Sequence, residues 1–249
     1  MIPTFTARLA IALPLALALA SCGDEAGTEA SLAGEPVAEV AAPEGQAWSE
    51  IAVKTDRGGY LVGNPDAPIK LVEYGSLTCP ACAAFSAEAS EPLMREYVDS
   101  GRVSFEFRSF LIHGPMDLTL TRLVDCGSPM QAVPLSDQVW ANLEQILGPA
   151  QQRQQQLDAA LSLPENERFP AFAEAAGLLD FFASRGLSRD QARTCLADVD
   201  ALQSTAEVSQ TYSTQDNVQK TPTFYLNGVE LPDSQWAGVE SALQRAGAR

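Results

Sequence analysis

The sequence is short of positive charge and of histidine. Lysine and arginine number 16 against 32 aspartate and glutamate residues, the formal net charge is −16, and one histidine occurs in 249 residues. A surface with this charge repels phosphate, so electrostatic binding to nucleic acid is excluded and adhesion to anionic lipid headgroups is disfavoured. The hydrophobic share of 46% is still enough to bury a core in one or two domains.

Long hydrophobic runs are also missing. The apolar stretch Leu9–Ala20 follows Arg8 and is too short to span a bilayer as a helix, but it has the length of the apolar part of a secretory signal. We therefore expect an exported protein. The stretch ends in Leu19-Ala20-Ser21-Cys22, which resembles the lipobox of bacterial lipoproteins. The resemblance implies a signal peptide over residues 1–21, lipidation of Cys22 and a periplasmic or extracytoplasmic lipoprotein anchored to a membrane. The alternative is an ordinary signal peptide that is cut elsewhere.

An acidic segment of low hydrophobicity follows. Between Cys22 and Glu50 there are seven acidic residues and no basic residue. This composition is typical of a solvated segment whose charges repel one another. We expect residues 22–47 to form a flexible acidic tether and the folded domain to span residues 48–249.

Cysteine is scarce, and its count of five is odd for an exported protein. Lipidation of Cys22 leaves four cysteines, of which Cys79 and Cys82 form a close Cys-Pro-Ala-Cys motif. Cys126 and Cys195 are far apart in the sequence, in segments with helical patterns. We expect two pairs with different roles, the distant pair being a structural disulfide. A zinc site of four thiolates is the alternative, but the wide spacing and the exported context argue against it.

The periodicity of the first half predicts a βαβ unit. Ile69–Tyr74 is an apolar, β-branched run after the breaker Asn64–Pro68 and predicts a buried strand. Pro80–Val98 repeats apolar residues every four positions and predicts an amphipathic helix with a kink at Pro92. Val103–Phe110 alternates at period two and predicts a second strand. Strand, helix and strand in this order give two parallel strands.

The second half predicts helices and then a hairpin. From about residue 116 to residue 214 no strand pattern occurs, and glycine and proline divide helical patterns, which indicates a helical insertion. Thr223–Leu226 and Val229–Leu231 flank Asn227-Gly228, and this dipeptide suits a type I′ turn between two strands. A final helix is expected from about Ser234 to Arg245.

Together these features resemble the thioredoxin fold and, within it, the exported DsbA-like branch. The resemblance covers about residues 50–249 and depends on the Cys-Pro-Ala-Cys motif at a helix start, the helical insertion and the run Lys220–Gly228 before the last helix. It implies an α/β thioredoxin fold with a large helical insertion between the βαβ unit and a C-terminal ββα unit. It also implies a cis Pro222 facing Cys79. We expect no cofactor.

The helix start gives the cysteines different roles. The N-terminus of a helix lowers the pKa of a thiol, so Cys79 is expected to be the nucleophile. Cys82, one turn further on, is placed to attack a mixed disulfide between Cys79 and a substrate. Because Ala81 offers no side-chain donor, we expect the Cys79 pKa to lie below the free value of about 8.5 and well above the DsbA extreme near 3.5. The alternative is that Cys79 and Cys82 form a structural disulfide.

Three further residues are assigned through the resemblance. Glu73 matches the family's buried acidic residue, which relays a proton to or from Cys82; the alternative is a solvated strand residue. A cis Pro222 leaves the backbone of Thr221 free to pair with an extended substrate peptide, and Thr221 would tune the redox poise of the cysteines. The alternative is a trans proline that opens an edge strand. We interpret His113 as a loop residue.

The sequence therefore predicts an exported, lipid-anchored thiol:disulfide oxidoreductase that acts in the oxidase or isomerase direction rather than as a reductase. Its partners would be cysteine-containing exported proteins and a membrane redox partner, with no nucleic acid among them. No N-terminal dimerisation domain is visible in the sequence, so a monomer is expected. The alternative function is that of a thioredoxin-fold chaperone or scaffold without redox turnover.

Overall fold

The computed structural model describes Met1 and residues 32–249. The expected signal peptide, the expected lipidation site Cys22 and the first part of the expected tether lie outside the described residues. In the described part, one mixed sheet has the strand order β1-β2-β4-β3-β5-β6. Its strands are β1 (Ala52–Lys54), β2 (Tyr60–Gly63), β3 (Ile69–Gly75), β4 (Val103–Ser109), β5 (Thr223–Leu226) and β6 (Val229–Glu230).

The predicted βαβ unit is present. Strands β3 and β4 pair in parallel, with Ile69 opposite Val103 and Gly75 opposite Ser109. Between them, α2 (Pro80–Pro92) continues into the π-helical segment η2 (Leu93–Val98). The change of helix type occurs at the expected kink, because the proline ring has no N–H to donate to the preceding turn.

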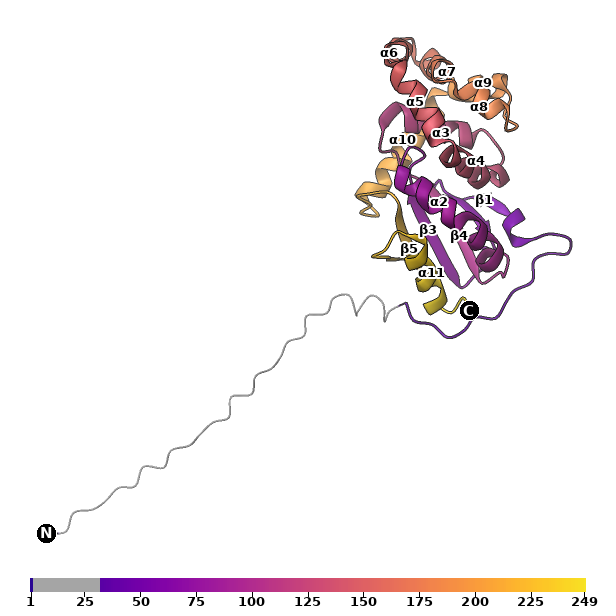
Figure 1. Cartoon of the computed structure of the whole chain (residues 1–249), viewed down its shortest axis with the longest axis vertical. Coiled ribbons are helices and arrows are strands. Elements are labelled where there is room, and N and C mark those ends of the chain that lie inside the picture. Colours follow the sequence, from indigo (N-terminus) through magenta and orange to yellow (C-terminus); the bar gives the residue numbers. More distant parts are fainter. Residues whose placement is uncertain (2–31) are drawn as a thin grey trace.

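The C-terminal unit follows the predicted pattern. β5 runs antiparallel to β3, and the hairpin to β6 turns at Asn227 and Gly228, whose φ angles of 50° and 82° suit a type I′ turn. The last helix, α11 (Trp236–Arg245), lies beside α2 in front of the sheet (Figure 1).

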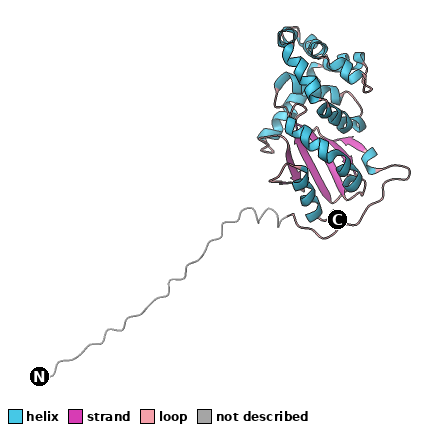
Figure 2. Ribbon diagram, in the orientation of Figure 1, coloured by secondary structure: helices cyan, strands magenta, loops and turns pink. Residues whose placement is uncertain are grey.

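The helical insertion forms a layer of its own at one end of the sheet (Figure 2). It extends from α3 to α10, close to the expected range 116–214. Its helices are α3 (Gly114–Asp125), α4 (Pro129–Ala141), α5 (Leu143–Gln152), α6 (Gln154–Leu161), α7 (Glu165–Ala176), α8 (Leu178–Ala183), α9 (Arg189–Leu196) and α10 (Val199–Thr214). Helix α4 packs against α2, so the insertion also contributes to the core next to the sheet. Among the described residues, no helix combines the length and the apolar character that crossing a membrane requires.

The segment before Trp48 differs from the expected tether over its described part. Leu32 is only 6% exposed, and the N–H groups of Gly34 and Val37 donate to carbonyl oxygens at the C-terminal end of α11. The Trp48 indole donates to a carbonyl of the same segment at 2.7 Å. The segment thus contacts the domain at these positions, while most of its residues between 33 and 47 are exposed to solvent.

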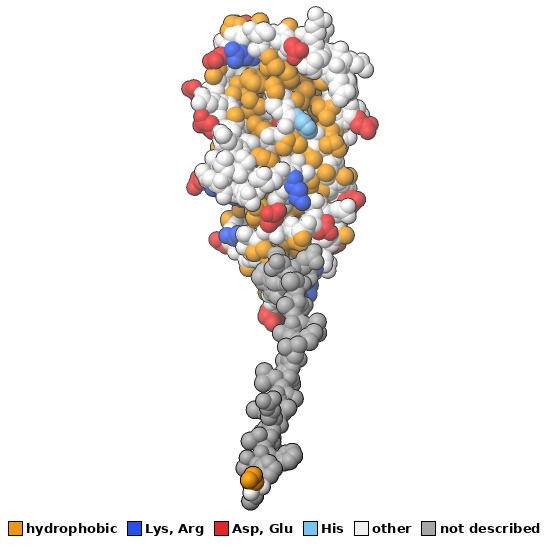
Figure 3. Space-filling model, turned by 90° about the vertical axis from the view of Figure 1, so that its left-hand side faces the viewer, with side chains coloured by type: hydrophobic (Ala, Val, Ile, Leu, Met, Phe, Trp, Pro, Cys, Tyr) orange, Lys and Arg blue, Asp and Glu red, His pale blue; other side chains and the backbone are white. Residues whose placement is uncertain are grey.

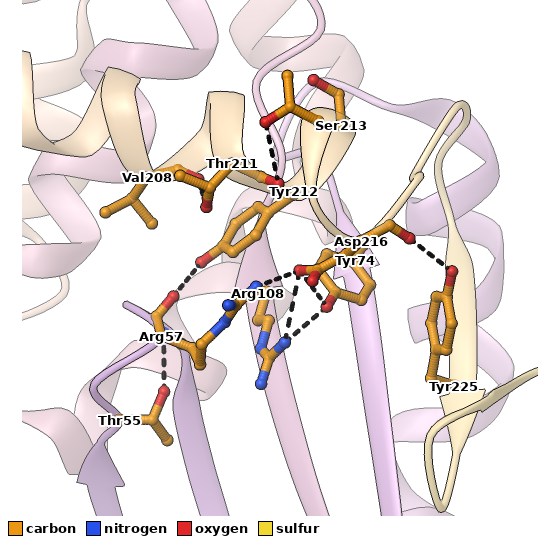
Figure 4. A network of polar contacts seen from close by, with 12 residues as sticks. Thr55, Arg57, Tyr74, Arg108, Val208, Thr211, Tyr212, Ser213, Asp216 and Tyr225 are labelled. Atoms are coloured by element: carbon orange, nitrogen blue, oxygen red, sulfur yellow. Dashed lines mark hydrogen bonds and ion pairs between the residues drawn. The ribbon is translucent and has the colours of Figure 1, made fainter.

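A polar network lies on the opposite face of the sheet from α2, where α10 ends. The Asp216 carboxylate accepts a hydrogen bond from the Tyr74 hydroxyl at 2.9 Å, pairs with Arg57 and lies 3.9 Å from the Arg108 guanidinium. The backbone carbonyl of Asp216 accepts a hydrogen bond from the Tyr225 hydroxyl at 2.9 Å. Figure 4 shows these side chains converging on Asp216. The network ties the loop between α10 and β5 to the central strands.

Candidate active site

Cys79 is the N-cap of α2. Its backbone is extended, with φ −85° and ψ 119°, and its Sγ accepts a hydrogen bond from the N–H of Cys82 at 3.4 Å. Pro80 occupies the first turn, where a missing N–H removes no helical hydrogen bond. The free N–H groups and the dipole at this helix end stabilise negative charge on the sulfur. The structure thus places Cys79 at the helix start, where the sequence predicts the nucleophile.

The loop before β5 faces this sulfur. The Thr221–Pro222 peptide bond is cis, and the Cys79 thiol donates to the carbonyl oxygen of Thr221 at 3.5 Å. The upstream part of the loop is held by the Asp216 network. The structure therefore brings together residues that are more than half the chain apart: the helix start and the cis-proline loop form the two sides of one site.

The two thiols have opposite electrostatic environments. The pKa of Cys79 is lowered from 9.0 to about 5, chiefly by a hydrogen bond from the Cys82 thiol; burial opposes the shift, and the Thr221 side chain adds to it. Burial, the hydrogen bond to Cys79 and the charge of Glu73 raise the pKa of Cys82. Near neutral pH, Cys79 is a thiolate and Cys82 is a thiol. This Cys79 pKa lies between the two limits expected from the sequence.

Glu73 lies on β3 behind the cysteines. It is 1% exposed, and its Oε1 has no hydrogen-bond partner among the described residues. Burial raises the pKa of Glu73 well above its usual value, and the charges of Asp137 and Cys79 add to the shift. A Cβ atom at Gly75 would lie 2.8 Å from Oε1, so glycine at that position leaves room for the carboxyl group. The alternative of a solvated strand residue does not hold.

A buried polar cluster that the sequence did not predict lies in the loop before Cys79. The Ser76 hydroxyl donates to both carboxylate oxygens of Asp117, at 2.9 and 3.0 Å, and Asp117 is 0% exposed. The Thr78 hydroxyl lies 2.7 Å from Nδ1 of the His113 ring, and the backbone N–H of His113 donates to Asp117 at 2.8 Å. His113, interpreted as a loop residue, is the N-cap of α3. The available signal was an acidic residue in the first turn of a helix, since that position favours a carboxylate.

An uncharged groove opens beside Cys79. Its volume is about 530 Å³, and Thr78, Pro80 and His113 form its end next to the nucleophile. The rest of its lining is Pro115, Met116, Leu147, Ala150, Gln151, Gln154, Leu157, Leu161 and Phe172. Figure 3 shows the hydrophobic side chains gathered around the histidine on this face. The groove can accept apolar side chains next to the reactive sulfur.

The second cysteine pair lies in the insertion. Cys126, at the end of α3, is bonded to Cys195 of α9, and their Cα atoms are 6.0 Å apart. Cys79 and Cys82 are free thiols. Because Cys126 and Cys195 are bonded to each other, the part of the chain that the structure describes contains no four-cysteine zinc site.

A family model described as "Thioredoxin" matches residues 55–245. The chain belongs to the thioredoxin family. A Rickettsia bellii protein with the provisional name protein-disulfide oxidoreductase is 25% identical over 199 residues, which are 79% of this chain and 68% of that protein. The crystal structure of a protein-disulfide isomerase from Novosphingobium aromaticivorans is 29% identical, covers 76% of this chain and 97% of its own, and superposes with a TM-score of 0.69.

The fold also matches a DsbA structure. Wolbachia pipientis alpha-DsbA1 has a TM-score of 0.58, covers 75% of this chain and 89% of its own, and is 18% identical. The thioredoxin fold with a large helical insertion, expected from the sequence, is confirmed. The enzyme class, a thiol:disulfide oxidoreductase, is confirmed as well.

Proposed function

We propose that this thioredoxin-family protein exchanges disulfides with extracytoplasmic proteins, with Cys79 as the attacking and Cys82 as the resolving cysteine. The observation that carries the proposal is the asymmetry of the two thiols. Cys79 has a pKa of about 5 and faces the cis-proline loop, whereas Cys82 is fully buried and its pKa is raised. Two-step thiol exchange requires an attacking cysteine that is a thiolate at neutral pH and a second cysteine that stays protonated until it resolves the mixed disulfide.

In the reductive direction, the Cys79 thiolate attacks one sulfur of a substrate disulfide. A mixed disulfide forms, and the first substrate sulfur leaves as a thiolate. Cys82 then gives its proton to the Glu73 carboxylate and attacks the Cys79 sulfur, which releases the second substrate thiolate. The substrate gains two electrons and Cys79–Cys82 becomes a disulfide. Oxidation of a substrate dithiol is the same sequence in reverse, with Cys82 leaving as a thiolate and taking a proton from Glu73.

The preferred direction of disulfide exchange follows from what stabilises the reduced Cys79–Cys82 pair. A stable thiolate favours the reduced enzyme and makes the disulfide form more oxidising. The low pKa of Cys79 therefore supports the oxidase or isomerase direction. Because Ala81 contributes no side-chain donor, we expect a reduction potential between those of thioredoxin and DsbA, roughly −250 to −140 mV.

Substrate recognition would combine main-chain contacts with apolar contacts. The backbone of Thr221 faces Cys79, which suits pairing with an extended peptide. The uncharged groove next to Pro80 suits apolar side chains close to the substrate cysteine. We infer that the substrates are unfolded or partly folded cysteine-containing proteins of the extracytoplasmic space.

Location and partners depend on the N-terminal sequence. The short apolar run and the Leu-Ala-Ser-Cys sequence around Cys22 support a lipoprotein anchored to a membrane. A membrane redox partner would then restore the oxidation state of Cys79 and Cys82 after each turnover. Labelling cells with a palmitate analogue tests the anchor: the full chain should take up the label, and a Cys22→Ala variant should not.

A chaperone or scaffold without redox turnover is the competing function, and the apolar groove would serve it equally well. The test is oxidation of a reduced, unfolded model protein and reduction of insulin, each with the wild type and with Cys79→Ala. We expect the rates to fall to the uncatalysed level in the variant. Equal rates for the two proteins, with aggregation suppressed by both, would establish the chaperone function instead.

A further inference from the structure

Asp137 belongs to insertion helix α4, but it packs behind the active-site helix. Its Oδ1 accepts hydrogen bonds from the hydroxyls of Ser86 at 2.7 Å and Ser90 at 2.9 Å, both on α2. Unlike Glu73, Asp137 is not fully buried. The insertion therefore places a carboxylate between the interior of the active-site layer and the solvent.

A small cavity connects Asp137 with Glu73. Its volume is about 20 Å³, and Glu73 and Asp137 both line it. The other polar lining residues are Ser86, Ser90 and Ser136, and the rest of the lining is apolar: Phe85, Ala89, Leu93, Met94, Phe105, Phe107, Val133 and Trp140. A cavity of this size holds about one water molecule. Oε1 of Glu73 is buried without a hydrogen-bond partner among the described residues. A water molecule in the cavity would give this oxygen a hydrogen-bond partner.

The charges of the two groups are coupled. After burial, the charge of Asp137 is the largest cause that raises the pKa of Glu73, and the charge of Glu73 in turn helps to raise the pKa of Cys82. Burial raises the pKa of Asp137, while Ser86 and Ser90 oppose that shift. The other titratable group acting on Glu73 is Cys79, and no cation of the described residues contributes to either carboxyl. A negative charge on Asp137 thus favours the protonated form of Glu73.

We propose that Asp137 is a positioning residue that completes a proton path from Cys82 through Glu73 and the cavity to the surface at α4. The proposal rests on the exchange activity proposed above. When Cys82 attacks the mixed disulfide, its proton passes to Glu73, across the cavity to Asp137 and then to solvent. When a substrate dithiol is oxidised, one proton travels inward along the same groups to the leaving Cys82 thiolate. Electrons move only between sulfur atoms.

The central test is Asp137→Asn, which keeps the shape of the side chain and removes its charge. The rate of mixed-disulfide resolution is measured against pH by rapid quenching, with wild type and variant. We expect resolution to slow about 3- to 10-fold near neutral pH, less than the loss of a direct proton acceptor would cause. The apparent pKa of the Glu73 group in the profile should fall, because the repulsion by Asp137 is gone. A profile that keeps its midpoint and its rate would overturn the proposal.

A matched variant separates the proton path from a merely structural role. Ser86→Ala combined with Ser90→Ala removes both hydrogen bonds and keeps the carboxylate. Stability should fall, and the Glu73 midpoint should not move downward, because the charge of Asp137 is still present. If Asp137→Asn and the double serine variant lose stability and change the pH profile in the same way, Asp137 only ties α4 to α2.

A measurement on the wild type covers the case in which Asp137→Asn does not fold. The side-chain carboxyl carbons of Glu73 and Asp137 are followed by NMR over pH in the reduced protein. Coupling predicts that each signal shows two titration steps, with midpoints common to both residues. Single, independent steps would refute the coupled path. If the wild type has no exchange activity at all, the proposed function itself is wrong. Failure of the proton path and failure of the proposed function are therefore distinguishable.

Discussion

One cysteine pair lies at the start of α2 and the other joins two helices of the insertion, and access to solvent does not explain their different chemistry. Cys79 is 5% exposed and Cys82 is 0% exposed, whereas Cys126 and Cys195 are both partly exposed. The free, less exposed pair has a polarised environment: a helix end and two hydrogen-bond donors stabilise the Cys79 thiolate. The bonded pair joins residues that are 69 positions apart. Reactivity in this chain therefore follows local polarity.

Each pair supports a different property. At the α2 pair, the cis-proline loop lies next to the Cys79 thiol, and the buried acid Glu73 lies behind the two cysteines. The insertion pair connects α3 with α9, so it restricts the unfolded chain over most of the insertion. We therefore expect loss of the first pair to remove activity and loss of the second to remove stability.

The largest effect is expected for Cys79→Ala. Without the nucleophile, exchange should fall to the uncatalysed rate while the fold persists, because Cys79 is one small side chain at the edge of the core. Insulin reduction and circular dichroism check the two parts of this prediction. Cys126→Ala with Cys195→Ala is the matched control and should keep exchange at a temperature where it is folded. If that control is as inactive as Cys79→Ala, the division of roles between the pairs is wrong.

Cys82→Ala should trap the intermediate. Cys79 can still attack, but no resolving thiol remains, so disulfide-linked adducts with substrates accumulate. Non-reducing gel electrophoresis after alkylation should show them in this variant and not in the double variant that also lacks Cys79. Adducts that persist without Cys79 would reverse the assignment of attacker and resolver.

Removing the insertion disulfide should lower stability. In the chain-entropy model a loop of this length contributes roughly 4 kcal/mol, and measured effects are often smaller. Urea unfolding of the Cys126→Ala, Cys195→Ala double variant should therefore show a free energy of unfolding lower by about 2–4 kcal/mol. In contrast, when the oxidised proteins are compared, Cys79→Ala with Cys82→Ala should lose much less, because a Cys79–Cys82 disulfide closes a very short loop. Equal losses in both double variants would contradict this contrast.

Local patterns were sufficient for most of the fold. The runs Ile69–Tyr74 and Val103–Phe110 and the Asn227-Gly228 turn predicted β3, β4 and the hairpin, because each pattern is a property of neighbouring residues. Strands β1 and β2 were missed. They are three and four residues long at one edge of the sheet, which is too short for an alternating pattern to stand out.

The site was predictable where a motif carried it and not where tertiary contacts did. Cys79 and Pro222 belong to recognisable local sequences. Asp117 and Asp137 do not: each is a single acid in a helical segment, where a solvated position is the usual expectation. Their partners Ser76 and Ser86 lie on another element far away in the sequence, so only the folded chain shows that these carboxylates are tied to the site.

The charge on Cys79 should make the stability of the reduced protein depend on pH. Its pKa falls from 9.0 to about 5 on folding, so in this range the unfolded chain binds more protons than the folded one. Stability of the reduced form should rise with pH from about 5 to 8, and this contribution is lost as the pH falls through about 5. Denaturant unfolding of reduced and oxidised protein across this range checks the prediction. The oxidised protein, whose Cys79 does not titrate, should lack this part of the slope; parallel curves would contradict a thiolate at neutral pH.

The smallest effect is expected at Thr221, which touches the reactive pair without belonging to it. Its side chain lowers the pKa of Cys79, but less than the Cys82 thiol does, and its carbonyl contact with Sγ is part of the backbone.

Thr221→Val keeps the branched shape and removes the hydroxyl. We therefore expect the Cys79 pKa to rise by less than about 1 unit and the potential to become more negative by at most about 30 mV. Thiolate absorbance and glutathione-equilibrium titration measure the two quantities. Thr223→Val, at the start of β5, is the control, because the Thr223 hydroxyl donates to the carbonyl of Lys220 on the same loop at 2.8 Å. That control should leave the Cys79 pKa unchanged, and a larger shift there than at Thr221 would mean that the position of the loop, rather than the hydroxyl, sets the difference between the two cysteine pairs.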